Sequence, residues 1–453
     1  YFDLGLWGSL TRDVAERLSK GDQEGLRKLW ATWWTYDLAG GVLVTSAAAV
    51  AAPTLVRFFS PGSGPAAIPL FVGLAAQAAA GPLLRHLSCT LNGLQRLDLS
   101  NLMIALITPM WAAGQVASLA LGFGLQGLMV NGLIFSALQV LVLIVLIARQ
   151  AYPMNFSPAG FSWEEFRRLV SFGWKVQAAQ GISQGFRNDR VVMGRQFSDG
   201  AIIASYQFGA NIVNYLAAAI SLLSSSILSA VSDLAARGDV ERIRVVFLRG
   251  TKYNSLAAVG LIGFAALFAH ELLVFWMGRS LPDSVVVLRI MTVGAIATGI
   301  GSCGQSVAVA LGRPGWAALA GALGLGATVI LYMGVGRRYD YVGLAASVSA
   351  GLALIQIIFM SGLRRFLEFR WREYVGNALI KPAILAVPLA GVYAAWGAIA
   401  SYFPPVDNRL RAFLVLAPTF ILAAAGSWAM ARAFGVIDKV DLDVLNSTGR
   451  RSS

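Results

Sequence analysis

The chain has 453 residues, of which 57% are hydrophobic and 13% are charged, and its mean hydropathy is +0.66. This composition excludes an ordinary water-soluble globular domain and favours an all-α, polytopic helical membrane protein. Lys and Arg outnumber Asp and Glu by 36 to 23, but they lie in short clusters between apolar runs. That pattern is typical of membrane topology with positive charge inside, and it argues against a nucleic-acid partner.

Residues 1–148 are predicted to form an N-terminal transmembrane bundle. The chain begins at Tyr1 in a stretch that reads like the second half of an apolar helix, so we expect an N-terminal piece to be absent. A charged, amphipathic connection over residues 11–22 follows. A helix needs about 20 apolar residues to cross the hydrocarbon core. Runs of that length predict spans at 33–56, 66–89, 98–121 and 125–148.

A polar segment over residues 149–168 carries Pro153 and Pro158 and predicts a cytoplasmic linker between two halves. The C-terminal transmembrane bundle is predicted over residues 169–433, with a cytoplasmic tail over residues 434–453. Its spans are expected at 169–196, 201–231, 245–269, 284–310, 316–336, 341–363, 378–401 and 410–433. All connections are short, so we expect no soluble domain on either side.

The distribution of basic residues predicts the orientation. One side of the predicted arrangement holds only a minority of them: Arg57, Arg187, Arg190, Arg195, Arg279, Arg289, Arg337, Arg338, Arg409 and Arg411. The other side holds most of the 36 Lys and Arg residues. Because basic residues are enriched in cytoplasmic loops, this richer side is expected to be cytoplasmic, together with the C-terminal tail.

The predicted helix at 169–196 carries ionisable residues inside the membrane. An ionised side chain near the bilayer centre costs roughly 2.5 to 3.5 kcal/mol, so it persists where it faces water, a partner or a ligand. One helical face collects Gln177, Gln180, Gln184, Arg187, Asn188 and Arg195. This cationic stripe predicts a cavity wall containing Arg187, with Arg190 and Arg195 as weaker candidates. The alternative is mutual pairing, or snorkelling of Arg195 to the interface.

Two other spans carry polar faces. The residues at helical spacing are Gln207, Asn211, Asn214, Ser221 and Ser225 in one span, and Thr298, Ser302 and Gln305 in another. They line a cavity or form interhelical hydrogen bonds, and the second interpretation is favoured for the serines. For Gln207, Asn211 and Asn214 both interpretations stay open. Arg85 is a candidate entrance for an anion or a snorkelling side chain, and the neighbouring His86 alone carries no signal.

The sequence lacks the motifs of common enzyme classes. It has no Walker motif, and the two cysteines, Cys89 and Cys303, have no metal-ligand neighbours, so no cofactor or metal site is implied. The acidic residues expected on the outer side are scattered over short loops: Glu271, Asp283, Asp340 and Asp407. A membrane glycosyltransferase or polymerase is expected to gather acids for metal or acid–base chemistry. A transporter is therefore favoured over an enzyme.

Several short stretches carry a family resemblance. They are YFDLGLWGSLTRDVAE at 1–16, NGLQRLD at 92–98, NDRVVMGR at 188–195, ASY at 204–206 and ALGRP at 310–314. In order and spacing these stretches resemble the polysaccharide transporter family of lipid-linked oligosaccharide flippases (Wzx-type). That family belongs to the multidrug, oligosaccharidyl-lipid and polysaccharide exporter superfamily.

The resemblance implies a MATE-like fold of two helical bundles around a central cavity. Fourteen helices would make a complete chain, of which the first and most of the second would be missing here. The implied function is translocation of a polyprenyl-pyrophosphate-linked oligosaccharide from the cytoplasmic to the outer leaflet of the bacterial inner membrane by alternating access. It would serve O-antigen, capsule or exopolysaccharide synthesis, with membrane lipid and polysaccharide polymerase and export proteins as partners.

The resemblance also implies roles for individual residues. Arg187, with Arg190 and Arg85, would hold the pyrophosphate, because the arginine fork forms paired, charge-assisted hydrogen bonds with phosphate. The sugars would lie along Gln177, Gln180, Gln184, Asn188, Asn211 and Asn214. Asp189 is the candidate for coupling to Na⁺ or H⁺, and pairing with a nearby arginine is its alternative role.

Two other functions stay open. A multidrug exporter of the same superfamily would share the fold but would require acidic cavity residues for organic cations, whereas the stripe is basic. A non-transporting membrane scaffold for polysaccharide assembly would have a collapsed, dry space around Arg187.

Overall fold

The computed structural model describes residues 7–59, 65, 67–150, 157–171, 200–224, 227, 231, 234, 239–311 and 314–436. Within these residues every regular element is a helix, which confirms the predicted all-α class. The chain divides into two compact units, Tyr1–Gly181 and Ile182–Ser453, each with its own core.

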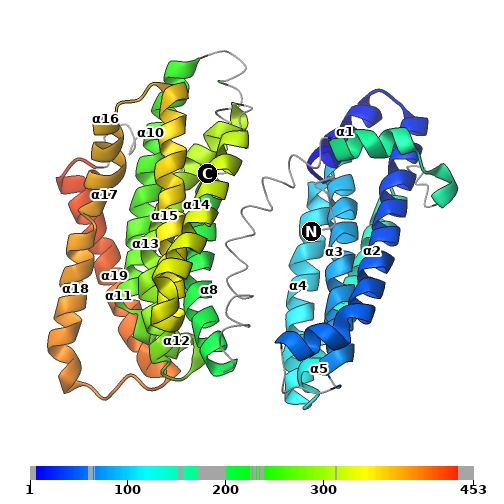
Figure 1. Ribbon diagram of the computed structural model, residues 1–453. Coiled ribbons are helices and arrows are strands. Elements are labelled where there is room, and N and C mark those ends of the chain that lie inside the picture. Colours follow the sequence, from blue (N-terminus) through cyan, green and yellow to red (C-terminus); the bar gives the residue numbers. More distant parts are fainter. Residues whose placement is uncertain are drawn as a thin grey trace, which may run out of the picture. The chain divides into compact units, whose positions relative to one another are not determined.

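The first unit is a bundle in which one helix touches most of the others. Its helices are α1 (Trp7–Ser19), α2 (Gln23–Phe59), α3 (Ala67–Gly93), α4 (Leu97–Ala120) and α5 (Gly124–Ala148). Helix α3 packs against α1, α2 and α5, and α4 packs against α5 (Figure 1). The tight turn between α4 and α5 needs positive φ at Gly122 (80°) and Gly124 (55°), which glycine adopts without steric cost.

The segment predicted as a linker packs on the first unit. It contains η1 (Pro158–Gly160) and a helical stretch over 163–171. The Ser162 backbone N–H donates a 3.1 Å hydrogen bond to Thr32 Oγ1 on α2, and Arg168 contacts Asp13 on α1 at 3.3 Å. Aromatic contact adds to this, since the rings of Tyr36 and Phe166 lie 5.4 Å apart. Residues 157–171 therefore belong to the bundle that precedes them.

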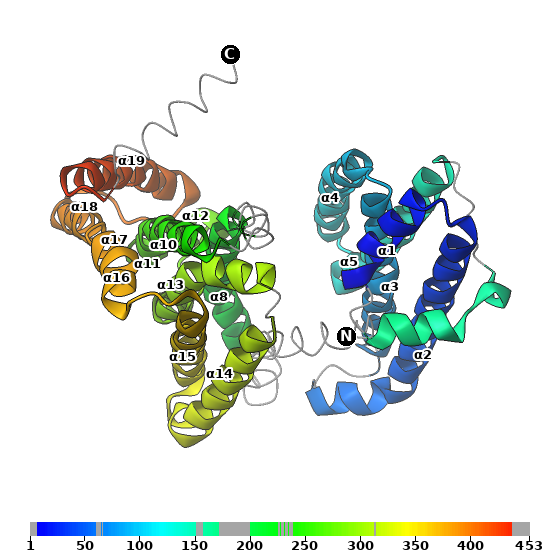
Figure 2. The same ribbon diagram turned by 90° about the horizontal axis from the view of Figure 1, so that it is seen from above.

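The second unit is built around α13. Its helical elements are α8 (Gly200–Leu223), α10 (Val240–Ala257), η3 (Ala258–Ile262), α11 (Gly263–Leu267), α12 (Ala269–Met277), α13 (Pro282–Ala310), α14 (Pro314–Gly334), η4 (Gly336–Tyr339), α15 (Asp340–Leu367), α16 (Trp371–Val375), η5 (Gly376–Ile380), α17 (Lys381–Ala383), α18 (Ala386–Ile399), η6 (Ala400–Tyr402) and α19 (Arg409–Ala433). Helix α13 contacts α8, α10 and α15, which surround it in the view from above (Figure 2).

Small residues let α13 approach its neighbours closely. A Cβ atom on Gly209 of α8 would lie 2.4 Å from the Ser284 carbonyl oxygen, and one on Gly294 would lie 2.8 Å from the Ser349 carbonyl oxygen of α15. Ser349 Oγ also donates to the Ile290 carbonyl at 2.8 Å. Close packing of small residues with hydroxyl hydrogen bonds is how helices associate in a bilayer, where apolar burial provides no preference.

The protein is a multi-pass membrane protein. Nine described helices are long and apolar enough to cross a membrane, and a bent pair raises the number to ten. Large apolar side chains stay exposed on the outer helices, as Val50 of α2 (84%) and Ile421 of α19 (65%) show, in keeping with contact to lipid. The span predicted at 169–196 lies mostly outside the described residues, and so does the end of the span predicted at 201–231. The described parts of the other predicted spans are mainly helical.

The span predicted at 245–269 is not one regular α-helix and ends in a sharp bend. Between 245 and 269 the chain passes through the π-helical turn η3 and then bends by 76° into α12. The Trp396 indole donates to Glu271 Oε1 at 3.0 Å, and His270 Nε2 lies 3.3 Å from the Val406 carbonyl oxygen. These contacts with α18 and the loop after it hold α12 across the end of the bundle.

Candidate functional site

The predicted cationic stripe falls outside the described residues. Residues 172–199 are not among them, so no position is given for Gln177, Gln180, Gln184, Arg187, Asn188, Asp189, Arg190 or Arg195. The roles assigned to these side chains stay predictions. The described candidates are Arg85 in the first unit and Asn211 and Asn214 in the second.

Arg85 lies on α3, about two turns before the helix ends at Gly93. Its side chain is exposed, whereas the next residue, His86, is completely buried. An exposed guanidinium near a helix end suits both an anion entrance and snorkelling to the interface. The two interpretations of Arg85 therefore stay open.

His86 has an acidic partner that its sequence neighbourhood does not reveal. Its Nδ1 atom lies 2.6 Å from Asp37 Oδ2 on α2, and the side chains are 0% and 1% exposed. The Trp33 ring stands edge-on to the imidazole, with centroids 5.6 Å apart. His86 is thus half of a buried Asp–His pair, which His86 alone does not indicate in the sequence. The available signal was Asp37, an acid inside a predicted apolar span.

The Asp37–His86 pair joins two groups that can each bind a proton. The carboxylate and the imidazole are in hydrogen-bond contact, so replacing either residue removes this contact between the two helices. Neighbouring turns supply further polar groups, because Thr90 Oγ1 donates to the His86 carbonyl at 3.0 Å. The pair therefore forms a buried polar contact between α2 and α3.

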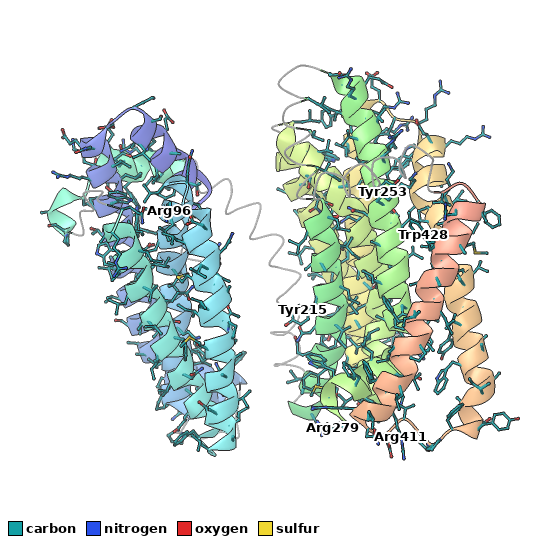
Figure 3. The ribbon with its side chains drawn as sticks, turned by 180° about the vertical axis from the view of Figure 1, so that it is seen from behind. Arg96, Tyr215, Tyr253, Arg279, Arg411 and Trp428 are labelled. Atoms are coloured by element: carbon teal, nitrogen blue, oxygen red, sulfur yellow. The ribbon has the colours of Figure 1, made fainter. Side chains whose placement is uncertain are left out.

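The amide side chains of α8 differ in exposure along the helix. The Gln207 Nε2 atom is buried and has no hydrogen-bond partner among the described residues. Asn211 is half-buried and Asn214 is exposed, next to Tyr215, which is 66% exposed and lies partway along the helix (Figure 3). An amide facing lipid would lose its hydrogen bonds with water, so the exposure of these amides favours contact with water rather than with lipid.

A second polar cluster ties three segments of the second unit together. Asn254 Nδ2 of α10 donates to Ser224 Oγ at 2.6 Å and to Ser302 Oγ of α13 at 3.0 Å. All three side chains are buried. Ser302 therefore forms interhelical hydrogen bonds, as favoured for the serines. Thr298, expected on the same face, bonds the Gly294 carbonyl of its own helix at 2.8 Å.

The comparison with family models decides the family. Residues 22–286 match the model described as polysaccharide biosynthesis protein, which covers more than half of the chain. The chain belongs to this polysaccharide biosynthesis protein family. The match agrees with the resemblance drawn from the short motifs. A search of curated protein sequences gives no match.

Solved structures similar to this polysaccharide biosynthesis family member share its fold. The lipid II flippase MurJ, in an inward closed conformation, has 15% sequence identity and a TM-score of 0.69. The similarity covers 96% of this chain and 90% of that one. An inward-facing multidrug resistance MATE family transporter of the MOP superfamily has 16% identity and a TM-score of 0.65, over 81% and 87% of the two chains. The MATE-like fold is thereby confirmed.

Three of the four acidic residues of this family member that were expected on outer loops have separate local partners. Glu271 accepts from Trp396, Asp283 Oδ1 accepts from the Tyr341 hydroxyl at 2.8 Å, and Asp407 pairs with Arg411 at 2.8 Å. In the part of the chain that the structure describes, no three His, Cys, Asp or Glu residues gather as a metal site. Cys89 and Cys303 are both buried.

Proposed function

We propose that the protein is a flippase that moves a polyprenyl-pyrophosphate-linked oligosaccharide from the cytoplasmic to the outer leaflet of a bacterial inner membrane. The observation that carries the proposal is the match to a polysaccharide biosynthesis family in a chain built almost wholly of membrane-spanning helices. The fold shared with a lipid II flippase supports the same class of cargo. The exported sugars would serve O-antigen, capsule or exopolysaccharide synthesis.

In the proposed mechanism, cationic side chains hold the pyrophosphate and amides hold the sugars. Arg187 is the principal phosphate ligand, with Arg190 and Arg85 as further candidates, because arginine binds phosphate oxygens in pairs. The exposed Asn214 and the half-buried Asn211 would contact sugar hydroxyls, together with Gln177, Gln180, Gln184 and Asn188. The polyprenyl tail would stay in the bilayer, since nothing compensates for removing it from lipid.

The membrane potential supplies a driving force of adequate size. Moving one elementary charge through 100 mV is worth about 2.3 kcal/mol, so two negative charges leaving a negative interior gain roughly twice that. Exchange for Na⁺ or H⁺ is the alternative driving force, with Asp189 as the proposed ion site. Membrane lipid and the polymerase and export proteins of the polysaccharide pathway are the proposed partners.

The proposal is tested by transfer of a labelled polyprenyl-pyrophosphate oligosaccharide across proteoliposomes that contain the full-length protein. Arg187→Ala and Arg187→Lys should each lower the transfer rate by about tenfold or more, because the paired hydrogen bonds to phosphate are lost in both. Arg338→Ala is the matched control, since Arg338 is an exposed arginine in the turn η4. It should leave the rate unchanged.

Other outcomes separate the alternatives. Unchanged transfer by folded Arg187 variants would reduce Arg187 to a structural charge. If the parent protein transfers no oligosaccharide but exports an organic cation, the multidrug function is correct, which the shared MATE fold also permits. If it transfers neither, the scaffold interpretation remains.

A further inference from the structure

An open pocket of about 530 Å³ lies where α15 meets α16, at the upper end of the second unit in Figure 1. It is lined by Arg364, Arg365, Glu368, Phe369, Arg370 and Trp371. None of these residues belongs to the predicted substrate stripe or to the polar clusters of α8 and α13. The pocket is therefore separate from every site considered above.

Buried aromatic residues build the pocket. The backbone of Glu368 has a φ of 50°, which ends α15 and reverses the chain. Phe369 then inserts into the core at 1% exposure, with its ring 5.3 Å from Phe247 and 5.4 Å from Tyr374. This anchor holds Trp371 against the last turn of α15, where the Arg364 guanidinium lies 6.0 Å from the Trp371 ring. The lining is thus positioned by packing.

The pocket carries an excess of positive charge. Three guanidinium groups face a single carboxylate, that of Glu368. Among the described residues no ion pair involves Arg364, Arg365 or Arg370. By contrast, two arginines of the adjoining helix α10 form ion pairs. Arg244 lies 2.9 Å from Glu373, and Arg242 lies 3.2 Å from Asp239. The pocket therefore presents cationic groups that the surrounding described structure does not neutralise.

The pocket lies at the level of the lipid headgroups. It opens at the end of Gly336–Leu367, a candidate membrane span, so its mouth lies at the level where the apolar core gives way to water. Trp371, which is half-buried, has the amphipathic ring that is enriched at this boundary. Phe366, on the last turn of the span, is 37% exposed and offers an apolar surface beside the arginines.

We propose that this pocket binds the phosphate-bearing headgroup of an anionic membrane phospholipid. Arg364, Arg365 and Arg370 would hold the phosphate oxygens through charge-assisted hydrogen bonds, and Trp371 would pack against the glycerol backbone. The acyl chains would lie along the membrane-facing side of α15. A lipid fits better than a free phosphate because the cationic groups adjoin apolar side chains at the membrane surface. The pocket needs no particular leaflet for this role.

Lipid binding can be measured without any transport assay, by native mass spectrometry of the full-length protein in detergent. Phosphatidylglycerol and phosphatidylcholine are added at equal concentrations. The parent should retain phosphatidylglycerol in preference, and the triple variant Arg364→Gln/Arg365→Gln/Arg370→Gln should lower its apparent affinity by about tenfold or more. The matched control is Arg337→Gln/Arg338→Gln/Arg372→Gln, which removes the same charge from exposed positions outside the pocket lining.

The control triple should bind phosphatidylglycerol like the parent. An equal loss of affinity for phosphatidylglycerol in both triple variants would overturn the proposal, because the effect would then follow from net charge alone. Unchanged binding by the pocket triple variant would also overturn it. Competition by inorganic pyrophosphate is the second arm: if it binds alone and displaces the lipid completely, the pocket takes a soluble phosphate compound instead. If the pocket triple fails to fold, Arg370→Gln against Arg372→Gln makes the same comparison one residue at a time. Support or failure of the lipid-binding proposal leaves the flippase proposal untouched.

Discussion

The Asp37–His86 pair is the described contact in which single side chains matter most. Both residues are almost fully buried and lie 2.6 Å apart. Removing one partner of a buried polar pair costs about 3 to 5 kcal/mol when the pair is ionised, because the other group loses this contact, whereas replacing both by apolar groups is often neutral. The contact therefore predicts strong dependence of the first unit on each residue singly.

His86→Leu should lower the melting temperature of the detergent-solubilised protein, with a loss of about 3 kcal/mol, because the Asp37 carboxylate loses its hydrogen bond to imidazole. The double variant Asp37→Leu/His86→Leu should recover part of that loss. Differential scanning fluorimetry measures both. Asp98→Asn is the control, since Asp98 pairs with Arg96 at an exposed site, where such pairs contribute about 1 kcal/mol or less. Equal effects of His86→Leu and Asp98→Asn would contradict this account.

At the scale of residues, the sequence indicated which side chains are unusual but not what they contact. Arg85 was singled out because a charge inside an apolar run is costly, and the same argument applies to Asp37, which was not. The partner of His86 is 49 residues away, and Asn254 reaches Ser302 across 48 residues. A helical pattern defines one face of one helix, and it does not identify the helix that packs against that face. Both clusters were therefore missed.

At the scale of elements, the close contact between helices α8 and α13 predicts an effect of a single methyl group. Gly209→Ala would place Cβ 2.4 Å from the Ser284 carbonyl oxygen and 3.0 Å from the Leu288 nitrogen, both backbone atoms that cannot rotate away. Helices α8 and α13 would have to separate, so we expect a loss of about 1 to 3 kcal/mol in stability.

Thermal unfolding of Gly209→Ala and Gly326→Ala in the same detergent measures the difference. A Cβ on Gly326 of α14 meets nothing within 4 Å, so alanine there should be neutral or should stabilise the helix by up to about 1 kcal/mol. A Gly209→Ala protein as stable as the parent would show that the two helices can be pushed apart at no cost.

Most membrane helices were predictable from the sequence, because crossing a bilayer imposes a minimum length of apolar chain. The bend of 76° after Leu267 was not, since no proline marks it and the interruption of the apolar run by His270 and Glu271 indicated only the end of a span. The bend depends on tertiary contacts of His270 and Glu271 with residues more than 120 positions later. Such contacts leave no periodic trace in the helix that they redirect.

At the scale of the whole molecule, the charge distribution predicts an orientation. In the second unit, Arg279 and Arg411 lie at the same end (Figure 3), while the arginines of the α15–α16 turn lie at the opposite end. Because basic residues favour the cytoplasm, a fluorescent protein fused after Ser453 should fold and fluoresce. Alkaline phosphatase inserted into the turn before Arg409 should be active outside, because the predicted orientation places the N-terminal end of α19 in the periplasm.

The reverse pattern, with a dark C-terminal fusion and an inactive phosphatase insertion, would invert the proposed topology. The pair of reporters is matched, since both report on the two ends of the same helix, α19 (Arg409–Ala433). Expression of each fusion is checked by immunoblotting. The flippase direction proposed above depends on this orientation, whereas the lipid pocket does not.

The burial of both native thiols makes the natural chain convenient for chemical labelling. Cys89 is 8% exposed and Cys303 is fully enclosed, so a polar maleimide has little access to either sulfur. New cysteines can therefore be introduced one at a time into the unmodified sequence, without first replacing the natural ones and losing their packing. A cysteine scan through residues 172–199 can then report, position by position, which side of the arginine-bearing segment faces water.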